Sequence, residues 1–97
     1  MRIALLIQYD GSEYYGWQIQ SDPNTIQGLM ENTLKKVFDN PSGLTGSGRT
    51  DSGVHSLGQV AHFDIDESPI PPENIWMALN RYLPDDIRVV ASKLVKE

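Results

Sequence analysis

The sequence has 97 residues and no cysteine, and its 8 lysine and arginine residues against 13 aspartate and glutamate residues give a formal net charge of −5. A chain of this length supports one domain with a modest core, and the lack of cysteine excludes disulfides and thiolate metal sites. The acidic balance argues against a protein that binds nucleic acid through its bulk charge. Because no apolar run is long enough for a membrane span and no signal-peptide pattern opens the sequence, we expect a soluble, cytoplasmic protein.

The first half of the sequence predicts a strand and a helix. Apolar side chains occupy both faces over residues 3–9, so we expect a strand that is covered on both sides at its start. From Asn24 the apolar period becomes that of an amphipathic helix, with Asn24 or Thr25 as the N-cap. The apolar residues at helical spacing are Ile26, Leu29, Met30, Leu34, Val37 and Phe38. Turn-forming residues up to Pro41 end this helix.

Two further strands are expected after the helix. A short strand around residues 44–45 lies among turn-forming residues. A longer strand over residues 57–65 alternates apolar and polar side chains, which places Phe63 on one face and Val60 on the other.

A loop and a helix follow over residues 67–83. Pro71 or Pro72 suits the first turn of this helix, and Leu83 ends it because a proline comes next. The apolar side chains that recur on one side of this helix are Ile75, Leu79, Tyr82 and Leu83.

Residues 86–95 predict the last strand. The resulting order β-α-β-β-α-β is typical of a ferredoxin-like α+β fold, in which an antiparallel sheet carries both helices on one face. We therefore expect a single domain over residues 1–97.

The segment GSGRTDSGVH, residues 46–55, places three glycines beside an arginine, an aspartate and a histidine. A guanidinium at Arg49 would keep the Asp51 carboxylate ionised and oriented, which suits a nucleophile or a base. Gly48 and Gly53 give the backbone room to approach a large ligand. Asp51 is our candidate catalytic residue, and a purely structural aspartate turn paired with the arginine explains the same residues equally well.

Three other chemistries fit the segment less well. The Gly-x-Gly pair at 46–48 does not lead from a long strand into a helix, as a nucleotide-binding loop does. The residues available to a metal are Asp51, His55, His62 and Asp64. Their spacing is loose for a metal site. A hydrolase triad would use a serine of the segment with its histidine and aspartate, but the strand-turn-helix elbow that such a serine needs is missing from the pattern.

Four stretches of the sequence are the most distinctive. They are YDGSEYYGWQ (9–18), TIQGLMENTLKKVF (25–38), GSGRTDSGVHSLGQVAHF (46–63) and NRYLPDDIRV (80–89). In this order they resemble the N-terminal half of the tRNA pseudouridine synthase A family, and the resemblance covers nearly the whole chain.

The resemblance implies roles for the residues of the segment. It makes Asp51 the catalytic residue, and it makes Arg49 the residue that enters the RNA stack beside the extruded uridine and contacts Asp51. The other residues that we expect to bind substrate are Gly48, Thr50, Gly53 and His55. The resemblance implies neither a cofactor nor a metal.

The resemblance also implies partners. The substrate is tRNA, modified in its anticodon stem-loop, and the family works as a homodimer with the RNA spanning both subunits. The second half of the family carries a tyrosine that stacks on the uracil and much of the basic surface, and this sequence stops near the point where that half begins. We therefore expect residues 1–97 to be a fragment with little or no activity alone.

Two alternatives remain open from the residues. The same fold serves as an RNA recognition module, in which Asp51 would be only structural, or as an interaction domain that self-associates through apolar surface. The aromatic residues Tyr14, Tyr15 and Trp17 could stack on nucleotides or pack in the core, and for Trp17 we favour packing.

Overall fold

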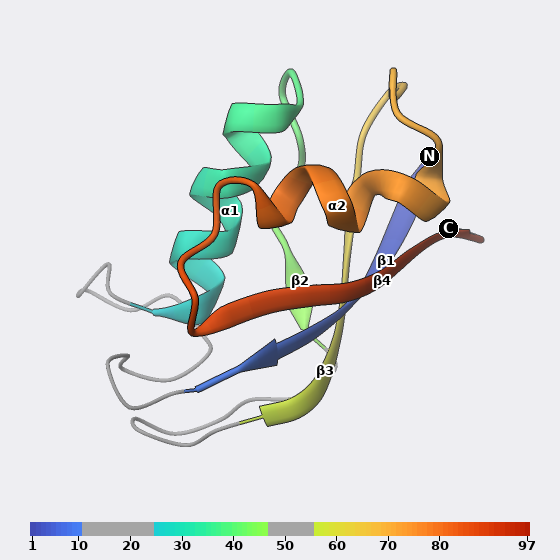
Figure 1. The fold of residues 1–97 in the computed structure, drawn as a ribbon. Coiled ribbons are helices and arrows are strands. Elements are labelled where there is room, and N and C mark those ends of the chain that lie inside the picture. Colours follow the sequence, from blue (N-terminus) through green and yellow to red (C-terminus); the bar gives the residue numbers. More distant parts are fainter. Residues whose placement is uncertain (11–24, 47–55) are drawn as a thin grey trace.

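The structure, a computed structural model, describes residues 1–10, 25–46 and 56–97. The elements in chain order are β1 (Arg2–Tyr9), α1 (Ile26–Val37), β2 (Thr45–Gly46), β3 (Ser56–Asp64), the 3-10 helix η2 (Pro72–Asn74), α2 (Ile75–Asn80) and β4 (Ile87–Val95). This order confirms the predicted ferredoxin-like α+β fold, with α1 and α2 together on one side of the sheet (Figure 1). None of the helices in these ranges is long and apolar enough to cross a membrane.

The sheet has the strand order β2-β3-β1-β4, and its three strand pairs are antiparallel. The central strand β1 pairs along its length with both β3 and β4. The edge strand β2 pairs only through Thr45 opposite His62 and Gly46 opposite Ala61. The two edges therefore differ, since β2 has two residues and β4 has nine.

One apolar core lies between the sheet and the helices. Alternate side chains of β1 point into it, and Ile3 and its cross-strand neighbour Phe63 are both 0% exposed. The helices contribute a second set of buried residues: Ile26, Met30, Leu34, Ile75 and Leu79. The burial of Ala61 and Ile65 beside Phe63, while Val60 is 49% exposed, confirms the predicted alternation of this strand.

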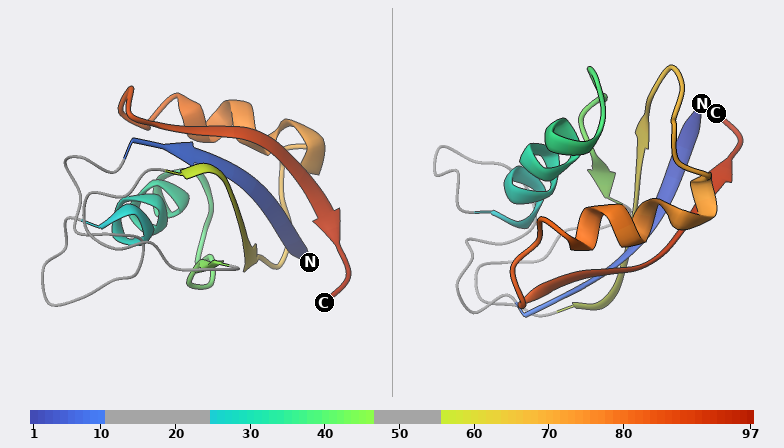
Figure 2. Two further views of the ribbon diagram at one scale, coloured as in Figure 1. Left: turned by 90° about the horizontal axis from the view of Figure 1, so that it is seen from below. Right: turned by 45° about the horizontal axis from the view of Figure 1, so that its top comes forward.

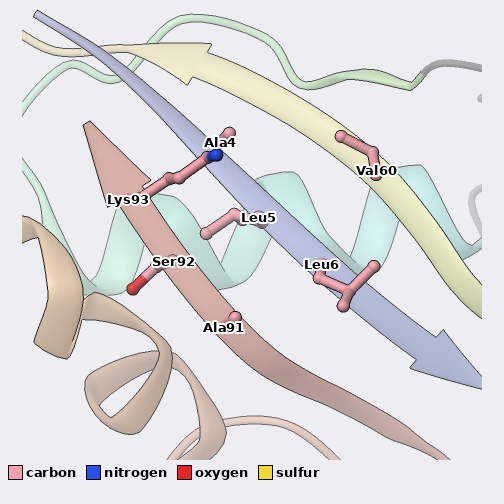
Figure 3. A pocket seen from close by; sticks show the side chains of 7 residues that line it. All are labelled: Ala4, Leu5, Leu6, Val60, Ala91, Ser92 and Lys93. Carbon is pink, nitrogen blue, oxygen red and sulfur yellow. The ribbon is translucent and has the colours of Figure 1, made fainter. Parts of the chain in front are cut away.

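The prediction that β1 is covered on both sides is wrong for the described part of the chain. Its side chains at even positions, Ala4 and Leu6, line an open hollow on the sheet face away from the helices (Figure 3). The reason is that both helices pack on the opposite face of the sheet. Among the described elements, none covers the face that carries Ala4 and Leu6.

The helix α1 begins where the sequence predicts. The buried Thr25 is its N-cap, and the Oγ1 atom of Thr25 accepts the amide of Gly28 at 3.2 Å. The helix ends at Val37, and shortly afterwards Asn40 adopts a φ of 50°, a left-handed conformation that asparagine tolerates in turns.

The helix α2 is shorter than predicted, because it ends at Asn80 rather than at Leu83. The side chain of Asn80 donates from Nδ2 to the carbonyl of Val89 at 2.8 Å and accepts the amide of Val89 at Oδ1 at 2.9 Å. The chain then turns, with the amide of Tyr82 donating to the carbonyl of Leu79 at 3.0 Å. Tyr82 was predicted to lie on the helix, but it lies in this turn and is 51% exposed.

The chain ends lie side by side (Figure 2). The amino group of Met1 donates to the carbonyl of Ile65 at 2.7 Å and pairs with the Glu97 carboxylate at 3.2 Å. This end of the sheet is opposite the end at which α1 begins (Figure 1).

Candidate functional site

The residues predicted to form the site lie outside the residues that the structure describes. They are the candidate catalytic residue and its five predicted neighbours: Asp51, Arg49, Gly48, Thr50, Gly53 and His55. The aromatic residues Tyr14, Tyr15 and Trp17 lie outside them as well. These assignments stay predictions. The structure describes the strands and the helix on either side of the two segments, residues 11–24 and 47–55.

Most of the described residues next to the two segments, 11–24 and 47–55, lie at one end of the sheet. Tyr9, the last residue of β1, lies opposite Ser56 of β3 and Ile87 of β4. The helix α1 begins at this same end (Figure 1). Residues 11–24 stand between β1 and α1 in the sequence, and residues 47–55 stand between β2 and β3. The exception is Gly46, the residue before 47–55, which lies opposite Ala61 and therefore farther along β3.

The backbone that leads into residues 47–55 is held by the first turns of α1. Leu44, next to β2, is 1% exposed, and both of its backbone groups bond to helix side chains. The amide of Leu44 donates to Oε2 of Glu31 at 2.9 Å, and its carbonyl accepts from Nε2 of Gln27 at 2.7 Å. The same Nε2 atom of Gln27 lies 3.2 Å from Oε2 of Glu31, to which it also donates. The three groups form a closed arrangement, which we call the Leu44 clamp.

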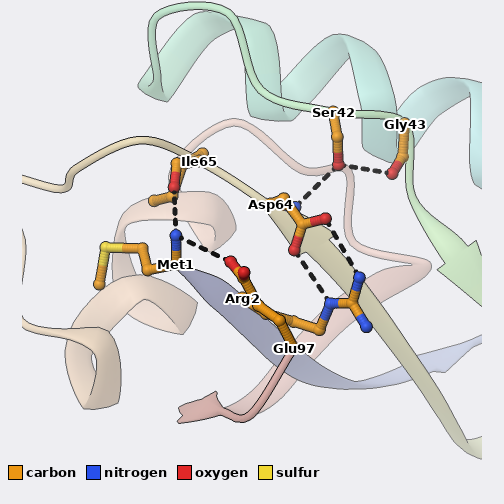
Figure 4. Close-up of polar contacts among 7 residues, drawn as sticks. All are labelled: Met1, Arg2, Ser42, Gly43, Asp64, Ile65 and Glu97. Carbon is orange, nitrogen blue, oxygen red and sulfur yellow. Dashed lines mark hydrogen bonds and ion pairs between the residues drawn. The ribbon is translucent and has the colours of Figure 1, made fainter.

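Two residues before Leu44, a second contact ties the same stretch to β3. The amide of Ser42 donates to the carbonyl of Asp64 at 2.9 Å, and the Oγ atom of Ser42 accepts the amide of Asp64 at 2.8 Å (Figure 4). Residues 42–46 are thus fixed at consecutive points from α1 and from β3 before the chain enters the segment that carries Asp51.

Sequence reasoning missed Gln27 and Glu31. On an amphipathic helix their positions belong to the polar side, and polar residues there are ordinarily solvated. The one available signal was their spacing of four, which places two side chains next to each other on a helix. Nothing in the local pattern indicates that both turn toward a backbone group in another element.

One residue considered for a metal site is already bound by an arginine. Arg2, opposite Asp64 in the sheet, donates from Nε to Oδ1 at 3.0 Å and from Nη2 to Oδ2 at 3.2 Å (Figure 4). These hydrogen bonds from the guanidinium lower the pKa of Asp64. Within the described ranges no group of three or more His, Cys, Asp or Glu residues could hold a metal ion. A metal shared by His62 and Asp64 therefore has no support in this part of the chain.

The sheet face away from the helices bears on the RNA recognition alternative. The residues that line the hollow on this face are Ala4, Leu5, Leu6, Val60, Ala91, Ser92 and Lys93 (Figure 3). RNA recognition modules stack bases on aromatic side chains of this face. In β3, the phenyl ring of Phe63 points into the core and is 0% exposed. None of the residues that line this hollow is aromatic, which argues against base stacking of that kind on the described part of the face.

These observations define a class of protein: a ferredoxin-like α+β domain whose β2–β3 connection carries a polar sequence with an arginine and an aspartate. A family model described as tRNA pseudouridine synthase matches residues 5–96. The chain belongs to this family.

Curated relatives show the same relationship. The tRNA pseudouridine synthase A of Shewanella piezotolerans is 50% identical over 98 aligned residues, which cover 100% of this chain and 37% of that protein. The protein of the same name from Caldicellulosiruptor saccharolyticus is 51% identical and covers 90% of this chain and 35% of its own length. The one from Ruminiclostridium cellulolyticum is 46% identical, with 99% and 39% covered. The chain thus spans little more than a third of the length of these relatives.

Proposed function

We propose that this chain is the part of a tRNA pseudouridine synthase that carries the catalytic aspartate, and that it acts on uridine in the anticodon stem-loop of tRNA. The observation that carries the proposal is the family match over residues 5–96. Within that span the sequence has an arginine at 49 and an aspartate at 51, in a glycine-rich segment that starts and ends on the sheet.

The chemistry needs a carboxylate and no cofactor. Conversion of uridine to pseudouridine breaks the bond from the sugar to N1 of uracil, turns the base, and forms a bond from the same sugar carbon to C5. The proton on C5 is lost and N1 gains one, so the product is an isomer of the substrate. The Asp51 carboxylate can attack the sugar or the base as a nucleophile, or take the C5 proton as a base.

Arg49 has two roles in this proposal. Its guanidinium, two positions from Asp51, favours the ionised carboxylate. A target base inside a stacked stem-loop must also be extruded, and a planar guanidinium that fills the gap offsets part of the lost stacking. Gly48 and Gly53 let the backbone approach the RNA, while Thr50 and His55 supply hydrogen-bonding groups beside it.

The length of the relatives shapes the rest of the proposal. We infer that residues 1–97 form one domain, the N-terminal half of a synthase, and that the other half supplies the remainder of the uracil pocket and a basic surface for tRNA. The net charge of −5 supports this, since this half alone would repel a polyanion. We further propose a homodimer of the full-length protein and, because cysteine is absent and tRNA is the substrate, a cytoplasmic location.

The test is tritium release from a tRNA transcript labelled at C5 of its uridines. The assay uses the 97-residue chain and a hybrid synthase, in which residues 1–97 replace the matching stretch of the Shewanella piezotolerans protein. We expect release with the hybrid, little or none with the chain alone, and none with the hybrid carrying Asp51→Asn. The control is Asp39→Asn, an exposed aspartate after α1, which should leave release unchanged. An inactive hybrid, or an Asp51→Asn hybrid as active as its parent, would overturn the proposal.

A further inference from the structure

We propose that Gln27 and Glu31 are positioning residues for the isomerisation, because the Leu44 clamp fixes the point from which the chain enters the segment bearing Asp51. This inference rests on the proposed function. It assigns a role in the reaction to two side chains of α1 that are themselves remote in sequence from the Gly-Arg-Thr-Asp motif.

The first argument is that the clamp satisfies a buried backbone completely. A buried amide and a buried carbonyl each need a partner, and those of Leu44 find theirs in Glu31 and Gln27 instead of in a neighbouring strand. The hydrogen bond between Gln27 and Glu31 orients the two side chains relative to each other. Either side chain alone would serve only one of the two backbone groups.

The second argument is the shortness of β2. Only Thr45 and Gly46 pair with β3, so the sheet itself provides a small part of the fixation at this edge. Asp51 follows Gly46 by five positions in the sequence. Leu44 is not among the residues paired with β3, so its position rests on the clamp, and only the two paired residues separate it from the catalytic segment.

The third argument is that α1 is a rigid reference for this edge. Its inner face, with Ile26, Met30 and Leu34, is 0% exposed, and Thr25 caps its first turn. The fit on its outer side is close as well. A Cβ atom added to Gly43 would lie 3.3 Å from Oε2 of Glu31, a tight contact at the side chain that holds Leu44.

The clamp also has a chemical asymmetry that an experiment can use. The amide of Leu44 needs an acceptor, which the side-chain oxygen of glutamine can also provide. The carbonyl of Leu44 needs a donor, which glutamate in place of Gln27 cannot provide, and the new carboxylate would face both this carbonyl and Glu31. Glu31→Gln should therefore keep the clamp, whereas Glu31→Ala and Gln27→Glu should open it.

The experiment measures kcat and KM of the hybrid synthase on a tRNA transcript. We expect Glu31→Ala and Gln27→Glu to lower kcat by about 10- to 100-fold with KM nearly unchanged, because a displacement of about 1 Å at a reacting group is enough for such a loss. Glu31→Gln should retain most of the activity. Leu34→Val is the control, since it loosens the packing of the same helix without touching the clamp.

A second readout separates position from stability. Hydrogen exchange at the Leu44 amide should accelerate in Glu31→Ala and stay slow in Glu31→Gln and Leu34→Val. A wild-type kcat in Glu31→Ala and Gln27→Glu would overturn the inference. So would a loss of kcat in Leu34→Val as large as theirs. In both cases the unsubstituted hybrid is active, so the proposed function stands. An inactive parent hybrid would overturn both.

Discussion

At both edges of the sheet, helix side chains form hydrogen bonds with the backbone of a buried residue, but the two edges differ in how many side chains take part. At the β4 edge, one amide side chain, that of Asn80, serves both backbone groups of Val89. At the β2 edge, two side chains, Gln27 and Glu31, share the backbone groups of Leu44. In each case a helix residue provides the partners that an additional strand would otherwise supply.

The strands next to these two contacts differ in length and in their further hydrogen bonds. The strand β4 has nine residues, pairs with β1 along its length, and is tied to η2 and α2 by Ser92. The Oγ atom of Ser92 accepts the amide of Trp76 at 3.0 Å and donates to the carbonyl of Pro72 at 2.7 Å. The short β2 pairs with β3 at two positions only, and among the described contacts the further support for this edge is the pair of hydrogen bonds between Ser42 and Asp64. The comparison indicates that the β4 contact serves stability and that the β2 contact serves the position of the segment that follows it.

The largest stability effect should come from Asn80→Ala. The change leaves the amide and the carbonyl of Val89 without their partner at a 0% exposed residue, and we expect a loss of about 2–3 kcal/mol in the free energy of unfolding. Urea unfolding of the 97-residue chain measures it, with Asn80→Asp as an intermediate case because it keeps the acceptor. Glu31→Ala should cost less, about 1 kcal/mol. Equal losses for the two variants would break the distinction between the edges.

The sequence predicts the parts of this comparison that depend on local pattern. The period of α1, a cap at Asn24 or Thr25 and the alternation of β3 all follow from residues close together in the chain, and the structure confirms them with Thr25 as the cap. The partners of Asn80, Glu31 and Gln27 lie 9, 13 and 17 positions away. No local pattern specifies such contacts, so the early end of α2 and the Leu44 clamp were not predictable. The arrangement of Arg49 and Asp51 stays a prediction.

A smaller effect should follow from the cap of α1, the helix that carries the clamp. Thr25→Ala removes the acceptor for the Gly28 amide, and we expect it to cost about 1 kcal/mol of unfolding free energy. Thr25→Ser keeps the hydroxyl and should recover most of that loss. The same urea titrations measure both variants. If Thr25→Ala also speeds hydrogen exchange at Leu44, the clamp depends on the first turn of α1 as well as on its two side chains.

The smallest effect should come from the ion pair between Arg2 and Asp64, which lies at the end of the sheet opposite Tyr9 and Ser56. The side chains are 30% and 43% exposed, so solvent and salt screen the pair. The hydrogen bonds from Arg2 lower the pKa of Asp64, so the unfolded chain binds a proton at Asp64 more readily than the folded chain does.

This contribution to stability is therefore fully present above the unfolded pKa of about 4 and is lost as the pH falls through the lower folded value. Asp64→Asn should reduce stability slightly near neutral pH, and its difference from the wild type should shrink below about pH 4 and in high salt. Urea titrations of the 97-residue chain between about pH 2.5 and pH 7 follow that difference. A difference that grows toward acid would show that the pair does not hold Asp64 ionised. A difference as large as that of Asn80→Ala would place the main polar support of the sheet at its chain ends, against the comparison of the two edges.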